Sequence, residues 1–129
     1  MRAALAAAKD KNLKVAVMSK LMPTRSASTM AQGGMNGVTG VTDEKDTVES
    51  HTFDTIKGGD YLCDQDAVEY FAENAGKIIY EMDYMGYPYN RQKDGHFHQR
   101  KMGGSSHARA SYFEDRAGHA MVHALFEQC

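Results

Sequence analysis

SKLMPTRSASTMAQGG, residues 19–34, is the stretch that decides how this chain folds. It follows the short apolar run Val15–Met18 and contains a proline, several small hydroxyl side chains and a pair of glycines. A strand that leads into a loop of this composition is where α/β proteins bring backbone N–H groups to a bound phosphate or cofactor. The sequence therefore predicts an α/β fold with a cofactor-binding loop over 19–34.

The residues before this loop predict a helix and a strand. Residues 1–9 are rich in Ala, Leu and Arg and favour a helix, which the polar turn 10–12 ends. Val15–Ser19 is short and partly β-branched, as expected for a buried strand. Helix, turn and strand in this order form the second part of a β-α-β unit. No GxGxxG is present, so we expect the first strand and its glycine-rich turn to lie upstream of Met1.

The residues after the loop are mostly helical in pattern. The spacing of apolar residues predicts a helix over 43–56 with Asp43 as its N-cap. A stronger pattern predicts a second helix over 64–85 with Asp64 as its N-cap. A third helix is predicted from about Tyr112 to the end of the chain.

One β-hairpin and one aromatic cluster are also predicted. Asp94-Gly95 lies at the centre of residues 89–99, and this dipeptide between such flanks favours a hairpin turn. The tyrosine-rich stretch 80–89 is typical of core or interface packing. In a fragment of a larger protein this surface would be exposed, which predicts self-association or poor solubility.

Composition excludes several classes of function. The formal net charge of −2 gives no basic surface, so we expect no nucleic-acid partner. No apolar run approaches the roughly 20 residues needed to cross a bilayer, so no direct membrane insertion is expected. Cys63 and Cys129 are the two cysteines and form no CxxC pattern, which fits a reducing, cytoplasmic compartment.

Five strings follow one another along the chain: MRAAL at 1–5, SK with PTRS and AQGG within 19–34, HTFDTIKGGD at 51–60 continued by LCDQDAV, GYPY with DG and QR within 86–100, and DRAGHAM at 115–121. In this order they resemble the flavoprotein subunits of succinate dehydrogenase and fumarate reductase. The resemblance covers residues 1–129 and implies one partial FAD-binding domain, the N-terminal part of a larger subunit. The implied fold is an incomplete Rossmann-like domain without its first strand and GxGxxG turn, followed by helical segments and a hairpin.

The same resemblance implies a set of binding residues. Ser19 and Lys20 would lie by the adenosine ribose, and residues 25–34 would wrap the flavin. The implied cofactor-binding residues are Ser19, Lys20, Arg25, Ser26, Ala27, Ser28, Ala31, Gln32, Gly33 and Gly34. Gly33 and Gly34 suit this task because a backbone can approach a flat ring closely only where no Cβ intervenes. The implied substrate-binding residues are Gln32, Gly33 and Met102, and Met102 replaces an aromatic that commonly flanks the substrate.

Ala27 is a second departure from the family. Members with covalently attached flavin carry a histidine at this position, and alanine has no nucleophile. We therefore expect FAD to bind non-covalently. This would lower the flavin potential and favour fumarate reduction over succinate oxidation.

The implied reaction is hydride transfer between the flavin and succinate or fumarate. The family's proton-donating arginine and its carboxylate clamp come from later parts of the subunit, so we expect no catalytic residue within these 129 residues and no activity from the chain alone. The resemblance implies partner subunits that carry iron–sulfur clusters and a membrane anchor. It also implies a cytoplasmic location at the inner face of the membrane.

Two alternatives remain open. L-Aspartate oxidase and adenylylsulfate reductase share the Gln-Gly-Gly loop, although the PTRS and KGGD strings favour the dicarboxylate enzymes. From a different class, a small metal-binding module would use His119, His123 and Glu127, which share a helical face at four-residue spacing. Without an HExxH motif, and with Arg116 on the same side, a solvated polar face is the favoured interpretation, so no metal site is predicted.

Overall fold

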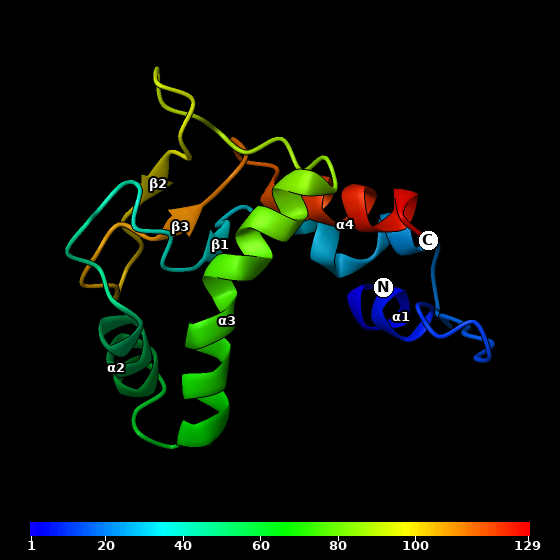
Figure 1. Ribbon diagram of the computed structural model, residues 1–129, viewed down its shortest axis with the longest axis horizontal. Coiled ribbons are helices and arrows are strands. Elements are labelled where there is room, and N and C mark those ends of the chain that lie inside the picture. The colour runs from blue at the N-terminus through cyan, green and yellow to red at the C-terminus, as the bar shows by residue number, and fades with distance from the viewer.

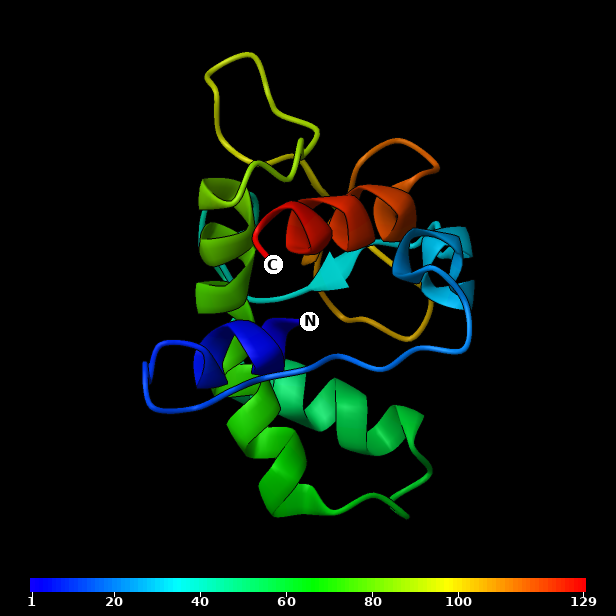
Figure 2. The same cartoon turned by 90° about the vertical axis from the view of Figure 1, so that its right-hand side faces the viewer.

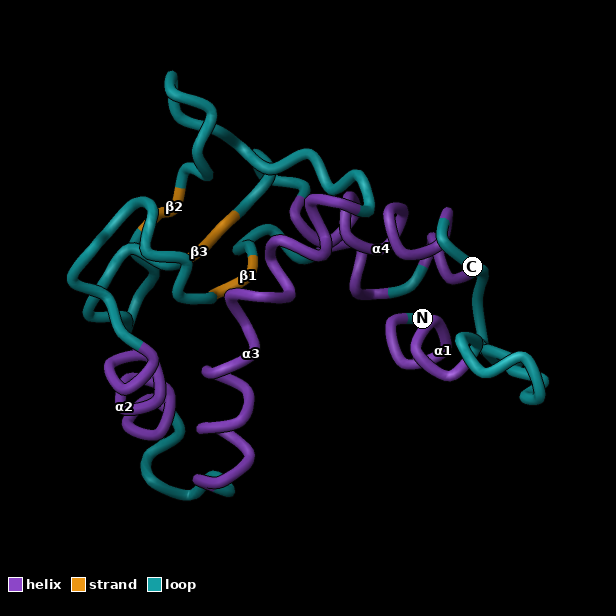
Figure 3. Tube along the Cα trace, in the orientation of Figure 1, coloured by secondary structure: helices purple, strands orange, loops and turns teal.

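Helices provide most of the regular structure in the computed structural model, which describes all residues from 1 to 129 (Figure 1). Long loops surround a very small sheet, as Figure 3 shows. The helices are α1 (Arg2–Ala7), α2 (Val48–Gly58), α3 (Gln65–Tyr84) and α4 (Ala117–Glu127), the 3-10 turns are η1 (Pro23–Arg25) and η2 (Ala27–Met30), and the strands are β1 (Met35–Asn36), β2 (Gln99–Arg100) and β3 (Ala110–Ser111).

Helix α3 links the two ends of the molecule and confirms the prediction over 64–85. The side chain of Asp64 caps its start by accepting the Ala67 N–H at 3.1 Å. One half of α3 packs beside α2, and the other half reaches α4 (Figure 1). Its buried residues recur at three- and four-residue steps and are Ala72, Ala75, Ile79 and Met82.

Helix α2 begins five residues after the predicted start, so the assignment of Asp43 as its N-cap is wrong. Thr47 is the cap, in an extended conformation, and its side chain accepts the Ser50 N–H at 3.1 Å. The carboxylate of Asp43 accepts instead from the Lys45 N–H and from the His107 ring. The Asp43 carboxylate, which was predicted to cap the helix, is therefore occupied by these two contacts.

The buried strand predicted at Val15–Ser19 is absent, whereas α1 forms as expected. Figure 2 shows the segment between α1 and η1 running along the surface. Val15 and Val17 are 41% and 49% exposed. A strand forms only where a neighbouring strand pairs with its N–H and C=O groups, and β1, β2 and β3 pair only with one another.

The sheet has the order β1-β3-β2, and both pairings are antiparallel. Helix and strand are thus both present, as an α/β sequence predicts, but these residues do not form the parallel ladder of a Rossmann-like unit. The predicted hairpin over 89–99 is present as a tight turn at Asp94-Gly95, closed by the single bridge between Arg91 and Phe97.

The core lies where α3, α4 and the hairpin meet. Tyr87 and Tyr89 are buried in it, while Tyr80 and Tyr84 of the same stretch are exposed. The full cluster comprises Ile79, Met82, Tyr87, Tyr89, Phe97, Ala120, Ala124 and Leu125. Helix α4 starts at Ala117, not near Tyr112, because the Tyr112 carbonyl accepts the Asn90 N–H in the strand region. None of the helices has the length and apolar character that a membrane crossing requires.

Candidate functional site

A cleft of about 850 Å³ lies between the segment that enters β1 and the face of α3. One side is formed by Gly33–Asn36 together with Met102. The other side carries apolar α3 residues, including Phe71 and Ile78, and Arg2 of α1 also lines the space. The volume falls within the range of small-molecule and cofactor sites, which are mostly apolar with a few polar groups.

Arg100 fixes the backbone of the loop at this cleft. Its Nη2 donates to the carbonyl oxygens of Gln32 and Gly33, both at 3.0 Å. Its guanidinium lies over the Tyr112 ring, 4.1 Å from the ring centroid. The N–H groups of Gln32, Gly33 and Gly34 donate to no other group of the chain. The loop therefore presents three successive free donors on a backbone that is held from its carbonyl side.

Contacts within the chain require a glycine at 34 and leave little room for a side chain at 33. Gly34 has φ +109°, and a Cβ there would lie 2.4 Å from the Ser111 carbonyl oxygen of β3. A Cβ on Gly33 would come within 3.3 Å of Met102 Cε. The prediction assigned these glycines to a cofactor contact, but the close approach of β3 alone already requires Gly34. Both glycines and Met102 nevertheless line the same cleft, as a shared site requires.

The other predicted binding residues do not line this cleft. Gln32 faces a second hollow of about 420 Å³, which Arg116 and His119 also line. Ala31 packs against the start of α4, where its carbonyl accepts the Gly118 N–H at 2.7 Å. The remaining predicted residues line neither hollow and are Ser19, Lys20, Arg25, Ser26, Ala27 and Ser28.

The polar face of α4 brings together two of its three proposed metal ligands. The rings of His119 and His123 stack with centroids 4.2 Å apart. Glu127 does not join them, and no group of three His, Cys, Asp or Glu side chains in the structure is arranged to hold a metal ion. The alternative of a metal-binding module thus lacks its third ligand.

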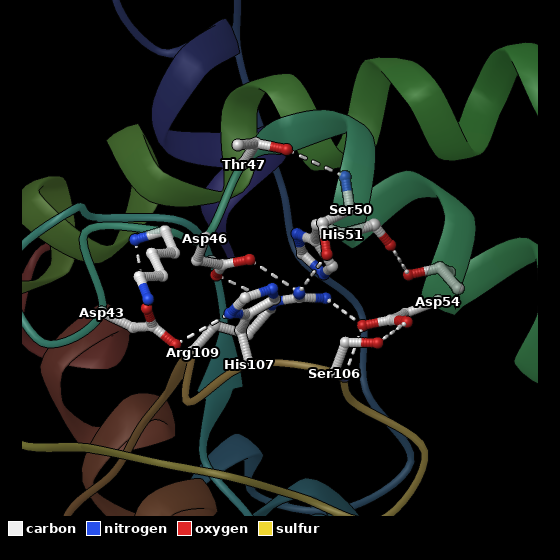
Figure 4. A network of polar contacts seen from close by, with 12 residues as sticks. Asp43, Asp46, Thr47, Ser50, His51, Asp54, Ser106, His107 and Arg109 are labelled. Atoms are coloured by element: carbon white, nitrogen blue, oxygen red, sulfur yellow. Dashed lines mark hydrogen bonds and ion pairs between the residues drawn. The ribbon is translucent and has the colours of Figure 1, made fainter.

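A buried ion network that the sequence reasoning missed lies behind the cleft (Figure 4). Arg109, only 1% exposed, donates to Asp46 through Nε at 3.0 Å and Nη2 at 2.7 Å. Its Nη1 donates to Asp54 at 2.9 Å, and Nη2 also reaches Ser50 Oγ at 3.2 Å. The four-residue spacing of Asp46, Ser50 and Asp54 is the one sequence signal that could have indicated this polar face.

His51 belongs to the same region and is 2% exposed. Neither of its ring nitrogens has a hydrogen-bond partner. Burial, reinforced by the charge of Arg109, lowers the pKa of His51 despite the nearby carboxylates. Its ring meets Phe71 edge-on at 5.5 Å, and Phe71 lines the cleft. The neutral imidazole therefore acts as packing support for the cleft wall.

The sequence model of a protein family described as "FAD binding domain" matches residues 1–129. The chain belongs to this family. It is 48% identical over 128 residues to the 8-methylmenaquinol:fumarate reductase flavoprotein subunit of Wolinella succinogenes, covering 98% of this chain and 21% of that protein. It is 43% identical over 136 residues to the succinate dehydrogenase flavoprotein subunit of Coxiella burnetii, covering 99% of this chain and 23% of that protein.

The structure resembles solved members of the same group. A chain of the E. coli quinol fumarate reductase, FrdA, superposes with a TM-score of 0.89 at 35% identity, over 96% of this chain and 21% of that chain. The resemblance inferred from the five strings is thereby confirmed. The chain spans about a fifth of the length of these relatives.

Proposed function

We propose that this chain is the flavin-facing portion of a succinate dehydrogenase or fumarate reductase flavoprotein subunit. The observation that carries the proposal is the loop Gln32–Gly34, whose three N–H groups have no partner within the chain and whose first two carbonyls are held by Arg100. Gly33 and Gly34 of this loop line the apolar cleft. When bound, FAD would supply the hydride chemistry that interconverts succinate and fumarate.

The residues of the cleft fit a flavin. A flat ring that carries acceptor oxygens and nitrogens needs N–H donors at its edge and apolar contacts on its faces. Within the cleft the donors are the N–H groups of Gly33 and Gly34, and Phe71, Ile78 and Met102 provide apolar surface. We infer that Gln32, Gly33 and Met102 also border the dicarboxylate.

We infer that Ser19 and Lys20 contact the adenosine end of the cofactor. The backbone N–H groups of residues 14–22 make no hydrogen bond within the chain, and residues 13–19 form no regular secondary structure. A neighbouring strand could therefore pair with Val15–Ser19 and complete a Rossmann-like sheet. In that arrangement Arg25–Ser28 would follow the cofactor towards its ring.

The cleft offers no free cation to clamp a dicarboxylate. Arg2 is the cation that lines it, and its guanidinium is already paired with Glu81 at 2.8 and 2.9 Å. The family's acid and carboxylate clamp would then have to come from other parts of a flavoprotein. We infer that the chain alone does not catalyse the reaction.

We infer that the whole flavoprotein assembles with an iron–sulfur subunit and a membrane anchor at the cytoplasmic face of the membrane. Large apolar side chains that need cover in an assembly support this inference. Met18, Leu62 and Tyr84 are 94%, 87% and 93% exposed. Co-purification of both partners with the tagged flavoprotein is expected.

A chimera tests the proposed function. Residues 1–129 replace the matching segment of the Wolinella flavoprotein subunit, which is 48% identical. We expect the chimera to bind FAD and to reduce fumarate. A folded chimera that contains no flavin would contradict the proposal.

The same chimera tests the consequence of Ala27. Acid precipitation is expected to release its flavin into the supernatant, because no side chain at this position can form a covalent bond. Flavin that stays with the precipitated protein would show that the attachment is covalent. An Ala27→His variant is the matched comparison.

A further inference from the structure

The loop 101–109 joins β2 to β3 and carries Met102 to the wall of the cleft. Just after β2 the loop makes a tight turn, in which the Ser105 N–H donates to the Met102 carbonyl at 3.1 Å. Between them lie Gly103 and Gly104, and no atom lies within 4 Å of where their Cβ would be. On its β2 side Met102 follows Arg100, whose guanidinium holds the Gly33 carbonyl. Beyond the open Gly103-Gly104 turn, Met102 depends on what holds Ser106.

On the β3 side the loop is held at three points: Asp46 binds Arg109, Asp43 binds His107, and Asp54 of α2 binds Ser106. Of these points, Ser106 lies nearest to Met102 along the chain. The two carboxylate oxygens of Asp54 accept the Ser106 N–H at 2.6 Å and the Ser106 Oγ–H at 2.7 Å (Figure 4). Arg109 donates to the same carboxylate at 2.9 Å. Burial opposes ionisation of Asp54, but the bonds from Ser106 and the charge of Arg109 outweigh it and hold its pKa below the ordinary value. The carboxylate is thus charged and fully engaged at neutral pH.

We propose that Asp54 is a positioning residue: by holding Ser106, it keeps Met102 against Gly33 and so sets the shape of the cleft wall. One turn of backbone, Met102 to Ser105, transmits the restraint. The expected effect of this restraint on dicarboxylate binding rests on the proposed function, in which Met102 and Gly33 border the substrate. The restraint itself does not depend on it.

Asp46 provides a matched control. It binds the same Arg109 with two hydrogen bonds and is more buried, with a side chain 3% exposed against 8% for Asp54, but it makes no hydrogen bond to Ser106. Asp46→Asn therefore weakens the ion network at Arg109 and leaves both Asp54–Ser106 hydrogen bonds in place. Ser106→Ala leaves the Arg109 bonds to Asp46 and Asp54 in place and removes the hydroxyl bond from Ser106 to Asp54, while the bond from the Ser106 N–H remains.

The first test is methyl NMR on the full 129-residue chain. In the wild type we expect a nuclear Overhauser contact between the Met102 Cε methyl and the Gly33 α-protons. The contact should be lost in Asp54→Asn, weakened in Ser106→Ala and kept in Asp46→Asn. If Asp54→Asn does not fold, Ser106→Ala decides. A contact that persists in Ser106→Ala and Asp54→Asn, or that is lost equally in Asp46→Asn, would overturn the proposal.

The second test measures KM and kcat for fumarate separately in the flavoprotein chimera. Asp54→Asn should raise the KM for fumarate about tenfold, since misplacement of a contact by about 1 Å can cost up to about 100-fold. kcat should change much less, and Asp46→Asn should leave both values unchanged. A displaced methyl with an unchanged KM would contradict the assignment of Met102 to the substrate, while the NMR result would still support the restraint by Asp54.

Discussion

Arg109 and Asp46 form a two-bonded ion pair in which both side chains are almost completely buried, with N–O distances of 2.7 and 3.0 Å. The pair joins the residue that precedes β3 to the segment that precedes α2, 63 positions away in sequence. Asp54 adds a third charge from α2 itself. The network thus connects α2 and the segment before it to the start of β3, the central strand of the sheet.

Loss of the Arg109 charge should strongly destabilise the chain. Arg109→Met leaves Asp46 and Asp54 buried without their cation, and breaking a buried pair in this way costs about 3–5 kcal/mol. Urea denaturation measures the change in the free energy of unfolding. The control is Arg2→Met, which breaks a partly exposed pair with Glu81 worth about 1 kcal/mol or less. Equal effects of the two substitutions would contradict the role given to the buried network.

The start of α4 should not tolerate a side chain at Gly118. A Cβ there would lie 2.0 Å from the Ser28 carbonyl oxygen and 2.8 Å from Ala31 Cβ. Gly118→Ala should therefore cost about 1–3 kcal/mol and push η2 away from α4. At Gly58, the last residue of α2, no atom lies within 4 Å, so Gly58→Ala should be neutral or stabilising by up to about 1 kcal/mol. Thermal unfolding of both variants checks the contrast.

Arg100 should control flavin affinity through the backbone that it holds. Arg100→Ala removes two charge-assisted hydrogen bonds to the carbonyls of Gln32 and Gly33, and each such bond contributes about 1.5–3 kcal/mol. We expect the Kd of the chimera for FAD to rise by at least about tenfold, measured by flavin fluorescence. Lys101→Ala, at an exposed neighbouring position, is the control. An unchanged Kd in Arg100→Ala would show that the loop needs no such support.

Tyr87 should make stability fall at alkaline pH. Burial raises its pKa to about 12 in the folded chain, where its hydroxyl donates to the Ala117 carbonyl at 3.1 Å. In the unfolded chain tyrosine ionises at about 10, so between these values the folded state binds more protons and unfolding is favoured as pH rises. Two pKa units correspond to about 2.7 kcal/mol. Tyr87→Phe should lack this part of the slope in denaturation at pH 10–12, and an identical slope would contradict it.

Secondary structure was predicted most accurately from the sequence where several local signals agree. Helix α3 has a cap at Asp64 and a continuous apolar face, so its limits follow from residues close together in the chain. Val15–Ser19 has strand composition, but strand formation depends on a partner that composition cannot supply. Met102, Gly33 and Gly34 line one cleft, and their assignment to the substrate and the flavin stays a prediction.

Local sequence patterns could not predict the polar contacts that hold the site in place. Arg100 bonds to carbonyls 67 and 68 positions away, and Arg109 to carboxylates 55 and 63 positions away. An arginine in a hydrophilic stretch is most often exposed, and only the folded chain shows that Arg109 is buried. Such long-range partners explain why the residues that hold the loop Gln32–Gly34 could not be predicted from the sequence.

The central claim is tested most directly by the distance between the flavin ring and the backbone nitrogens of Gln32–Gly34 in a structure of the FAD-loaded chimera. We predict hydrogen bonds from these N–H groups to the ring, with heavy-atom distances of about 3 Å. A ring bound elsewhere, with these three amides left to solvent, would contradict the account.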